Sequence, residues 1–159
     1  MGTREEIFNE LNQLADKNNI TFDCFLGRHL DCGEICFDYS EKKGFVLFSY
    51  DRAEETCHYS TRNLEELKYT LFEKLCLWMG FDFEVKHRVT NLNLDRDDND
   101  LDSDTRKVAF ERALYSLNKI NSAWMKRTIP EYERYLNMWR KDKNVYFDID
   151  CMSFKVRES

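Results

Sequence analysis

The 159-residue chain has one proline, five glycines and three histidines, and it lacks the short motifs that mark common catalytic sites. It contains no glycine-rich phosphate loop, no Gly-x-Ser-x-Gly turn and no His-Glu-x-x-His helix. None of the histidines has a Ser, Cys or acidic partner at a recognised spacing. We therefore expect no enzyme activity and no cofactor. Carboxylates gathered in space around His58 or His87 are the remaining route to catalysis, and a deep polar pocket would favour it.

Long apolar runs and paired cysteines are also missing. No 18-residue apolar stretch predicts a transmembrane helix, and the charged start MGTREEIFNELNQL is unlike a secretory signal, so we expect a cytoplasmic protein. The six cysteines include no Cys-x-x-Cys pair, although Cys32-x-x-x-Cys36 and Cys57-His58 invite a zinc hypothesis. In a reducing compartment we expect all six thiols to be reduced and metal-free, most of them as small buried hydrophobic side chains.

The charge balance points to the class of partner. A net charge of −6 repels nucleic acid and anionic membranes, so we expect neither as a ligand, and it attracts basic proteins. The simpler interpretation is that the charge only aids solubility. The length and the 14% aromatic content predict one domain, residues 1–159, with a substantial core.

The first 60 residues predict a helix followed by a small sheet. Thr3 is a candidate N-cap for a helix over residues 3–18, whose apolar stripe is Ile7, Leu11, Leu14 and Ala15. Strand-like runs follow at 20–26, 34–40, 45–50 and 56–60, with turns at 41–44 and 51–54. Short strands separated by small turns predict a three- or four-stranded antiparallel meander.

A long amphipathic helix is expected from the N-cap Asn63 to about Val89, with Gly80 as a bend. Its broad apolar arc predicts nearly complete burial of Leu67, Leu71, Phe72 and Leu75. A further helix begins near Asp104, and another helical region covers 122–139. There Pro130 is expected to bend the helix or restart it through the box Thr128-x-x-Glu131. Residues 144–156 predict an extended tail or edge strand, which completes an α+β fold with a helical C-terminal half.

The loop 91–104 is the strongest charged feature, with six Asp among residues 95–104. An EF-hand register fails because Thr105 stands where the sharp turn needs Gly. We interpret the loop as a solvated segment that can meet a basic partner. The expected electrostatic contributors are Asp97, Asp98, Asp100, Asp102 and Asp104, with Glu54 and Glu55 as weaker candidates.

A second candidate surface surrounds Glu84-x-Lys86-x-Arg88 and Arg106. Residues two apart lie on different sides of a helix, so these three charges do not share one face. Glu84 and Arg88 are four apart, and the simpler expectation is a salt bridge within the helix.

The segment from about Phe45 to Leu136 resembles immunity protein family sixty-three of bacterial polymorphic toxin systems. The resemblance comprises a hairpin turn with Arg52, the long helix and a later group of residues. Its matching positions are Leu64, Leu67, Tyr69, Phe72, Met79, Phe83, Glu84, Lys86, Arg88, Val89, Arg106, Phe110, Leu114, Leu117, Lys119, Ile120, Asn121 and Trp124. The family pattern Asn-Pro-Glu-Trp is replaced by Asn121-Ser-Ala-Trp124.

The resemblance implies a cytosolic, non-enzymatic antidote that binds and neutralises a cognate, basic toxin domain. The alternative is a small cytosolic adaptor or regulatory module that binds a protein unrelated to toxins. The neighbouring gene discriminates the two, since a large secreted toxin encoded beside this chain favours immunity.

Overall fold

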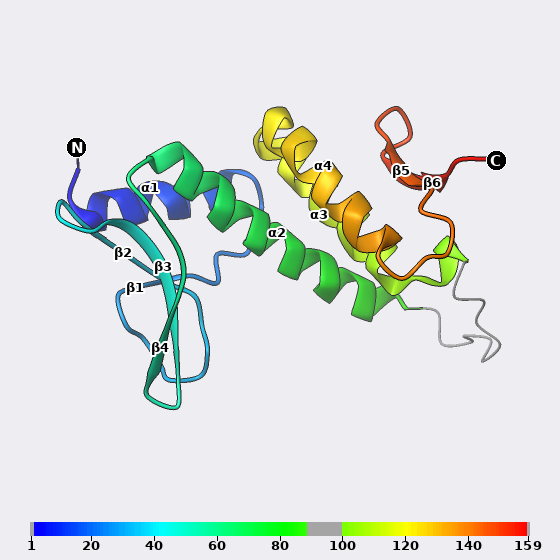
Figure 1. Ribbon diagram of the computed structural model, residues 1–159. Coiled ribbons are helices and arrows are strands. Elements are labelled where there is room, and N and C mark those ends of the chain that lie inside the picture. Colours follow the sequence, from blue (N-terminus) through cyan, green and yellow to red (C-terminus); the bar gives the residue numbers. More distant parts are fainter. Residues whose placement is uncertain (1, 89–99, 159) are drawn as a thin grey trace. The chain divides into compact units, whose positions relative to one another are not determined.

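The computed structural model describes residues 2–88 and 100–158, which form two compact units, Met1–Leu75 and Cys76–Ser159 (Figure 1). The boundary between the units falls within one long helix, α2 (Leu64–His87). Each unit is described by itself below. The expected α+β fold, with an N-terminal helix and a helical C-terminal half, is confirmed.

The first unit begins with α1 (Arg4–Lys17), where the predicted N-cap Thr3 forms a capping box with Glu6. The Thr3 side chain accepts a hydrogen bond from the Glu6 amide, and the Glu6 carboxylate accepts one from the Thr3 amide. Ile7, Leu11 and Ala15 are buried as expected, whereas Leu14 is only half-buried.

Four strands follow: β1 (Phe25–Leu26), β2 (Cys36–Ser40), β3 (Gly44–Asp51) and β4 (Glu54–Thr61). The β2–β3–β4 meander is antiparallel as predicted, but β1 pairs parallel with β2, so the sheet is mixed. The predicted strand 20–26 was wrong except for its last two residues. The Ile20 amide instead bonds back to the Ala15 carbonyl at 2.9 Å, so this segment starts by closing the end of α1.

The alternation of side chains along β3 gives the sheet two different faces. Phe45, Leu47 and Ser49 are buried on one face, which we call the inward face. Phe37 of β2 is opposite Leu47 in the register, and its ring stacks on Phe8 of α1. The start of α2 is capped by Asn63, and Leu67, Leu71, Phe72 and Leu75 are at most 1% exposed, as predicted.

The second unit contains the end of α2, a 3₁₀ turn η1 (Leu101–Ser103), α3 (Thr105–Ile120), α4 (Ser122–Asn137), β5 (Val145–Asp148) and β6 (Ser153–Val156). The helix α2 runs through Gly80 without the interruption that its low helix propensity suggested. A Cβ atom at residue 80 would stand 2.2 Å from the backbone oxygen of Ala109 on α3. Gly80 therefore permits the close approach of two helix backbones.

Pro130 does not restart α4, and that prediction was wrong. Helix continues from Ser122 to Asn137, and the Thr128 hydroxyl donates to the Trp124 carbonyl at 2.9 Å instead of capping a new start. Packing explains the continuity, because Tyr132 beyond the proline is buried and stacks on Phe110 of α3 at 4.4 Å between ring centroids. Tertiary contacts on both sides of Pro130 outweigh its local cost.

The predicted tail at 144–156 is an antiparallel hairpin of β5 and β6. The Glu111 carboxylate of α3 accepts hydrogen bonds from the Phe154 amide and the Ser153 hydroxyl, at 2.9 and 2.8 Å. These bonds attach the hairpin to α3. Among residues 2–88 and 100–158, no helix has the length and apolar character that crossing a membrane requires.

Candidate partner-binding surface

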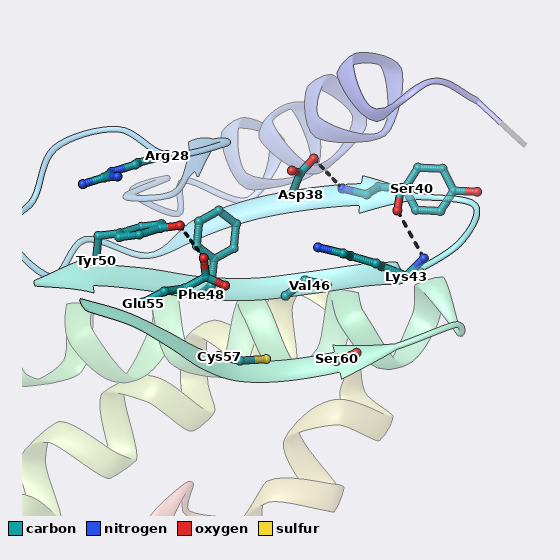
Figure 2. Close-up of a pocket in the computed structure, with 12 residues that line it drawn as sticks. Arg28, Asp38, Ser40, Lys43, Val46, Phe48, Tyr50, Glu55, Cys57 and Ser60 are labelled. Carbon is teal, nitrogen blue, oxygen red and sulfur yellow. Dashed lines mark hydrogen bonds between the residues drawn. The ribbon is translucent and has the colours of Figure 1, made fainter. Parts of the chain in front are cut away.

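A groove of about 480 Å³ lies on the outward face of the β2–β3–β4 sheet, opposite Phe45 and Leu47 (Figure 2). Its floor is Val46, Phe48 and Tyr50, which alternate along β3. Strand neighbours add the remaining polar and charged side chains of the lining, chiefly Asp38, Ser40, Glu55, Cys57 and Ser60, with Arg28 and Lys43 from loops. The period of two along each strand gathers these residues on one surface.

An aromatic ring and two charged groups form one end of the groove. The Tyr50 hydroxyl donates a hydrogen bond to the Glu55 carboxylate, which raises the pKa of Tyr50. The Arg28 guanidinium lies over the Tyr50 ring, 4.1 Å from its centroid. This end of the groove thus already holds a guanidinium by a cation–π contact next to a carboxylate.

The β3–β4 turn beside this end is held in an uncommon conformation. Arg52 and Ala53 both have positive backbone φ angles, 51° and 66°. Residues other than glycine adopt this conformation at a cost of about 1–2 kcal/mol each. The Asp31 carboxylate accepts a hydrogen bond from the Ala53 amide at 2.8 Å. The backbones of Cys32 and Asp51 pair in an isolated antiparallel β-bridge. The preceding loop therefore supports the turn. Of the acidic residues in and beside this turn, Asp31, Asp51, Glu54 and Glu55, only Glu55 lines the groove.

His58 lies on the other face of the sheet, at the irregular position where the register of β3 and β4 shifts. Its Nε2 is 2.7 Å from the Ser49 hydroxyl, and burial, together with the nearby Lys74 charge, lowers the pKa of His58. Sequence reasoning missed this pair because the contact depends on the bulge. Cys57 lines the groove while His58 faces Ser49, so the expectation that they point to opposite faces is confirmed.

The structure places the predicted charges around α3 in capping roles. Asp104 caps α3 by accepting from the Arg106 amide at 3.0 Å, and its carboxylate also accepts two bonds from the Arg106 side chain. Arg106 donates a further bond to the Tyr135 carbonyl of α4 at 3.1 Å. Two of the five predicted Asp, Asp97 and Asp98, lie outside the described residues.

The remaining two Asp differ in their surroundings. Asp100 caps η1 and accepts from the Ser103 hydroxyl at 2.7 Å, a bond that lowers the pKa of Asp100. Asp102 is 85% exposed, with the Lys107 ammonium 3.3 Å from its carboxylate. Asp102 thus presents a far more accessible charge than Asp104, whose side chain is 21% exposed.

At the end of α2, the expected Glu84–Arg88 salt bridge is present. Two hydrogen bonds of 2.8 Å join the carboxylate to the guanidinium, and they lower the pKa of Glu84. The Glu84 side chain is only 5% exposed, whereas Lys86 is exposed and pairs with Asp82 at 2.6 Å. Arg88 and Lys86 therefore offer more surface to a partner than Glu84 does.

The cysteines divide evenly between interior and surface. Cys24, Cys36 and Cys76 are buried, and burial raises the pKa of Cys24 to about 12. Cys32, Cys57 and Cys151 are exposed, so the expectation of mostly buried thiols holds for only half of them. Within residues 2–88 and 100–158, no three His, Cys, Asp or Glu side chains are grouped as metal ligands.

Comparison with protein family models gives a match to this chain. The family model Immunity protein 63 matches residues 41–134, which is more than half of the chain. The chain belongs to this immunity protein family. No curated protein and no solved structure matches the chain.

The Immunity protein 63 segment runs from the turn before β3 to near the end of α4, close to the predicted range 45–136. It includes the groove floor on β3 and the groove residues of β4. It also includes the charged groups at the end of α2 and the start of α3. The groove residues Arg28, Asp38 and Ser40 precede the matched segment.

Proposed function

We propose that this protein is a cytoplasmic antidote of a bacterial polymorphic toxin system, which binds a cognate toxin domain and neutralises it without catalysis of its own. The observation that carries the proposal is the family match over residues 41–134. We also propose that residues 1–159 act as one immunity-type domain, because α2 runs through both compact units without a break.

The distribution of charge supports a basic toxin as the partner. Residues 1–75 carry 15 acidic and 9 basic side chains, whereas residues 76–159 carry 15 of each. The whole net charge of −6 therefore belongs to the first unit. Acidic surface accelerates the capture of a basic protein and leaves nucleic acid and anionic membranes disfavoured as ligands.

A tight antidote complex of ordinary size buries about 1,200–2,000 Å² in total. We keep the predicted contributors as candidates for that interface: the Asp-rich loop, Glu54 and Glu55 on β4, and the group Glu84, Lys86, Arg88 and Arg106. Exposure favours Asp102, Glu54, Glu55, Lys86 and Arg88 within these sets.

The test is co-expression with the toxin domain encoded beside this protein. We expect the wild-type chain to rescue growth and to co-elute with the toxin domain as a stable complex. Growth arrest despite abundant folded antidote, together with no binding of the purified components, would refute the proposed function.

A second measurement tests the Asp-rich loop alone. Because Asp100 and Asp104 cap helices, the informative variant replaces only Asp97, Asp98 and Asp102 with Asn. If the loop steers the toxin, association slows at low salt and the difference shrinks at high salt. An association rate equal to that of wild type at every salt concentration means that the loop is only a solvated connection.

A further inference from the structure

One exposed face of α3 carries two cations that have no carboxylate partner. The face consists of Val108, Arg112, Tyr115 and Lys119, which are all exposed and follow one another at a spacing of three or four residues. We call these four residues the α3 stripe. Among residues 2–88 and 100–158, no carboxylate pairs with the side chain of Arg112 or of Lys119.

Aromatic rings hold both cations in place. The Arg112 guanidinium lies 4.7 Å from the centroid of the Phe83 ring and 5.1 Å from that of Tyr115. The Lys119 ammonium lies 4.5 Å from the Tyr115 centroid. Phe83 belongs to the end of α2, which lies beside α3 in the second unit (Figure 1). A ring that stacks on a guanidinium orients it and leaves its N–H donors free, so these donors can still bind a carboxylate.

The acidic residues next in sequence to the stripe and to its α2 ring are already paired. The Glu111 carboxylate is 3.2 Å from the Lys107 ammonium and accepts the hairpin bonds described above. At the end of α2, Asp82 and Glu84 each pair with the cation four residues further along the helix. The two cations of the α3 stripe therefore give it a net positive charge.

We propose that the α3 stripe docks an acidic segment of the cognate toxin, whose carboxylates bind Arg112 and Lys119. The proposal rests on the proposed antidote function and identifies a surface that performs it. The toxin remains basic overall, and the stripe takes a local acidic segment of it. All four residues of the stripe lie within the matched family segment 41–134.

The geometry of the stripe defines the occupant more closely. Arg112 and Lys119 are seven residues apart on one helix, which places their Cα atoms about 10 Å apart along the axis of α3. Two carboxylates that are seven residues apart on a toxin helix have the same spacing. A pair of charge-assisted hydrogen bonds at this separation fixes the orientation of the docked segment as well as its position.

The rest of the stripe suits the centre of a protein interface. Tyr115 and Val108 are 42% and 39% exposed, and aromatic residues and Arg are enriched where binding energy concentrates. Covering this apolar surface excludes water from the neighbouring cations and strengthens their attraction to carboxylates. A nucleic acid also offers negative charge, but the net charge of −6 opposes its approach to this protein.

Two natural lysines test the surface on the unmodified protein. Lys119 belongs to the stripe, whereas Lys126 is also exposed but lies on α4. Acetylation of each lysine by an N-hydroxysuccinimide ester is followed by mass spectrometry, for the free protein and for its complex with the toxin domain encoded beside it.

We expect the complex to slow acetylation of Lys119 by about tenfold or more, since docking excludes water and reagent from the centre of an interface. Acetylation of Lys126 should keep its free rate. An unchanged rate at Lys119 in a stable complex would overturn the proposal, and so would equal slowing at both lysines. Absence of any complex would instead refute the antidote function itself, and this proposal with it.

A pair of charge variants tests the role of the two cations. The stripe variant combines Arg112→Gln with Lys119→Gln. The matched control combines Arg157→Gln with Lys126→Gln, because it removes the same two residue types from exposed positions and Arg157 also lies over a ring, 5.1 Å from the Tyr146 centroid. Both variants should keep the wild-type melting temperature, since exposed side chains contribute little to stability.

We expect the stripe variant to raise the Kd for the toxin domain by about tenfold or more at low salt, and the difference to shrink at high salt. The control should keep the wild-type Kd. Equal Kd values for the two variants would contradict an acidic occupant. Binding of single-stranded RNA by the wild-type protein that is lost in the stripe variant alone would assign the stripe to nucleic acid and overturn the proposal.

Discussion

The contact between Gly80 and Ala109 makes the replacement Gly80→Ala an informative perturbation. In an exposed helix, Gly→Ala stabilises by about 1 kcal/mol because alanine loses less backbone freedom on folding. At this site the new Cβ atom would lie 2.2 Å from the Ala109 oxygen and 3.0 Å from its carbonyl carbon. Ordinary contacts to a Cβ begin near 3.4 Å, so α2 and α3 must separate by about 1 Å.

The magnitude follows from the two opposing effects. Overpacking a close-packed site costs about 1–3 kcal/mol, and the upper part of this range applies because both colliding groups belong to helix backbones. Subtracting the gain in helix propensity of about 1 kcal/mol leaves a net loss of about 2 kcal/mol. For a chain of this length the melting temperature should fall by about 4–8 °C.

Urea unfolding followed by circular dichroism measures the change, with Asn118→Ala as the matched control. Asn118 is exposed on α3, so its replacement by alanine should leave stability unchanged or raise it by about 0.5 kcal/mol. If Gly80→Ala raised the free energy of unfolding by about 1 kcal/mol, helix propensity alone would govern residue 80. The close approach of α2 and α3 would then be refuted.

Three further predictions concern the core, His58 and the thiols. Leu71 is 0% exposed, so Leu71→Ala should lower the free energy of unfolding by about 2–5 kcal/mol. A decrease below about 0.5 kcal/mol in urea unfolding would contradict the burial of Leu71. The folded state lowers the pKa of His58 below its ordinary 6.5, so protonation favours the unfolded chain. The contribution of neutral His58 to the free energy of unfolding is therefore full above about pH 6.5 and is lost as the pH falls through the folded-state pKa of His58. The replacement His58→Gln should remove this pH dependence from unfolding curves recorded at a series of pH values. Finally, intact mass spectrometry of the protein from the cytosol should find six reduced thiols, and a native disulfide or stoichiometric zinc would overturn that expectation.

Local patterns were sufficient to predict the main elements. The capping groups Thr3, Asn63 and Asp104 each act on the first turn of their own helix, so sequence neighbours determine where those helices begin. The burial of Leu67 and Leu71 follows from helical periodicity in the same way. The Glu84–Arg88 pair was predictable because four residues separate the two charges on one helix.

The errors arose where a distant contact decides the local conformation. Pro130 remains within α4 because Tyr132 and Leu136 beyond it are buried, and no local rule contains that packing. The segment 20–24 has strand-like residues, but the Ile20 amide is used to close α1. Propensity is a weak preference that tertiary contacts can override.

The sequence by itself determined the α+β class, the helix starts, the buried face of α2 and the family, because these depend on neighbouring residues and on a matched pattern. Only the tertiary structure decided how the Arg106 charge is used, since its guanidinium donates to the Tyr135 carbonyl of α4 at 3.1 Å. It also decided that Phe48, Tyr50 and Glu55 share one groove. Strand pairing and a turn with positive φ angles at Arg52 and Ala53 bring these side chains together, and such non-local hydrogen bonds leave no periodic signal along the chain.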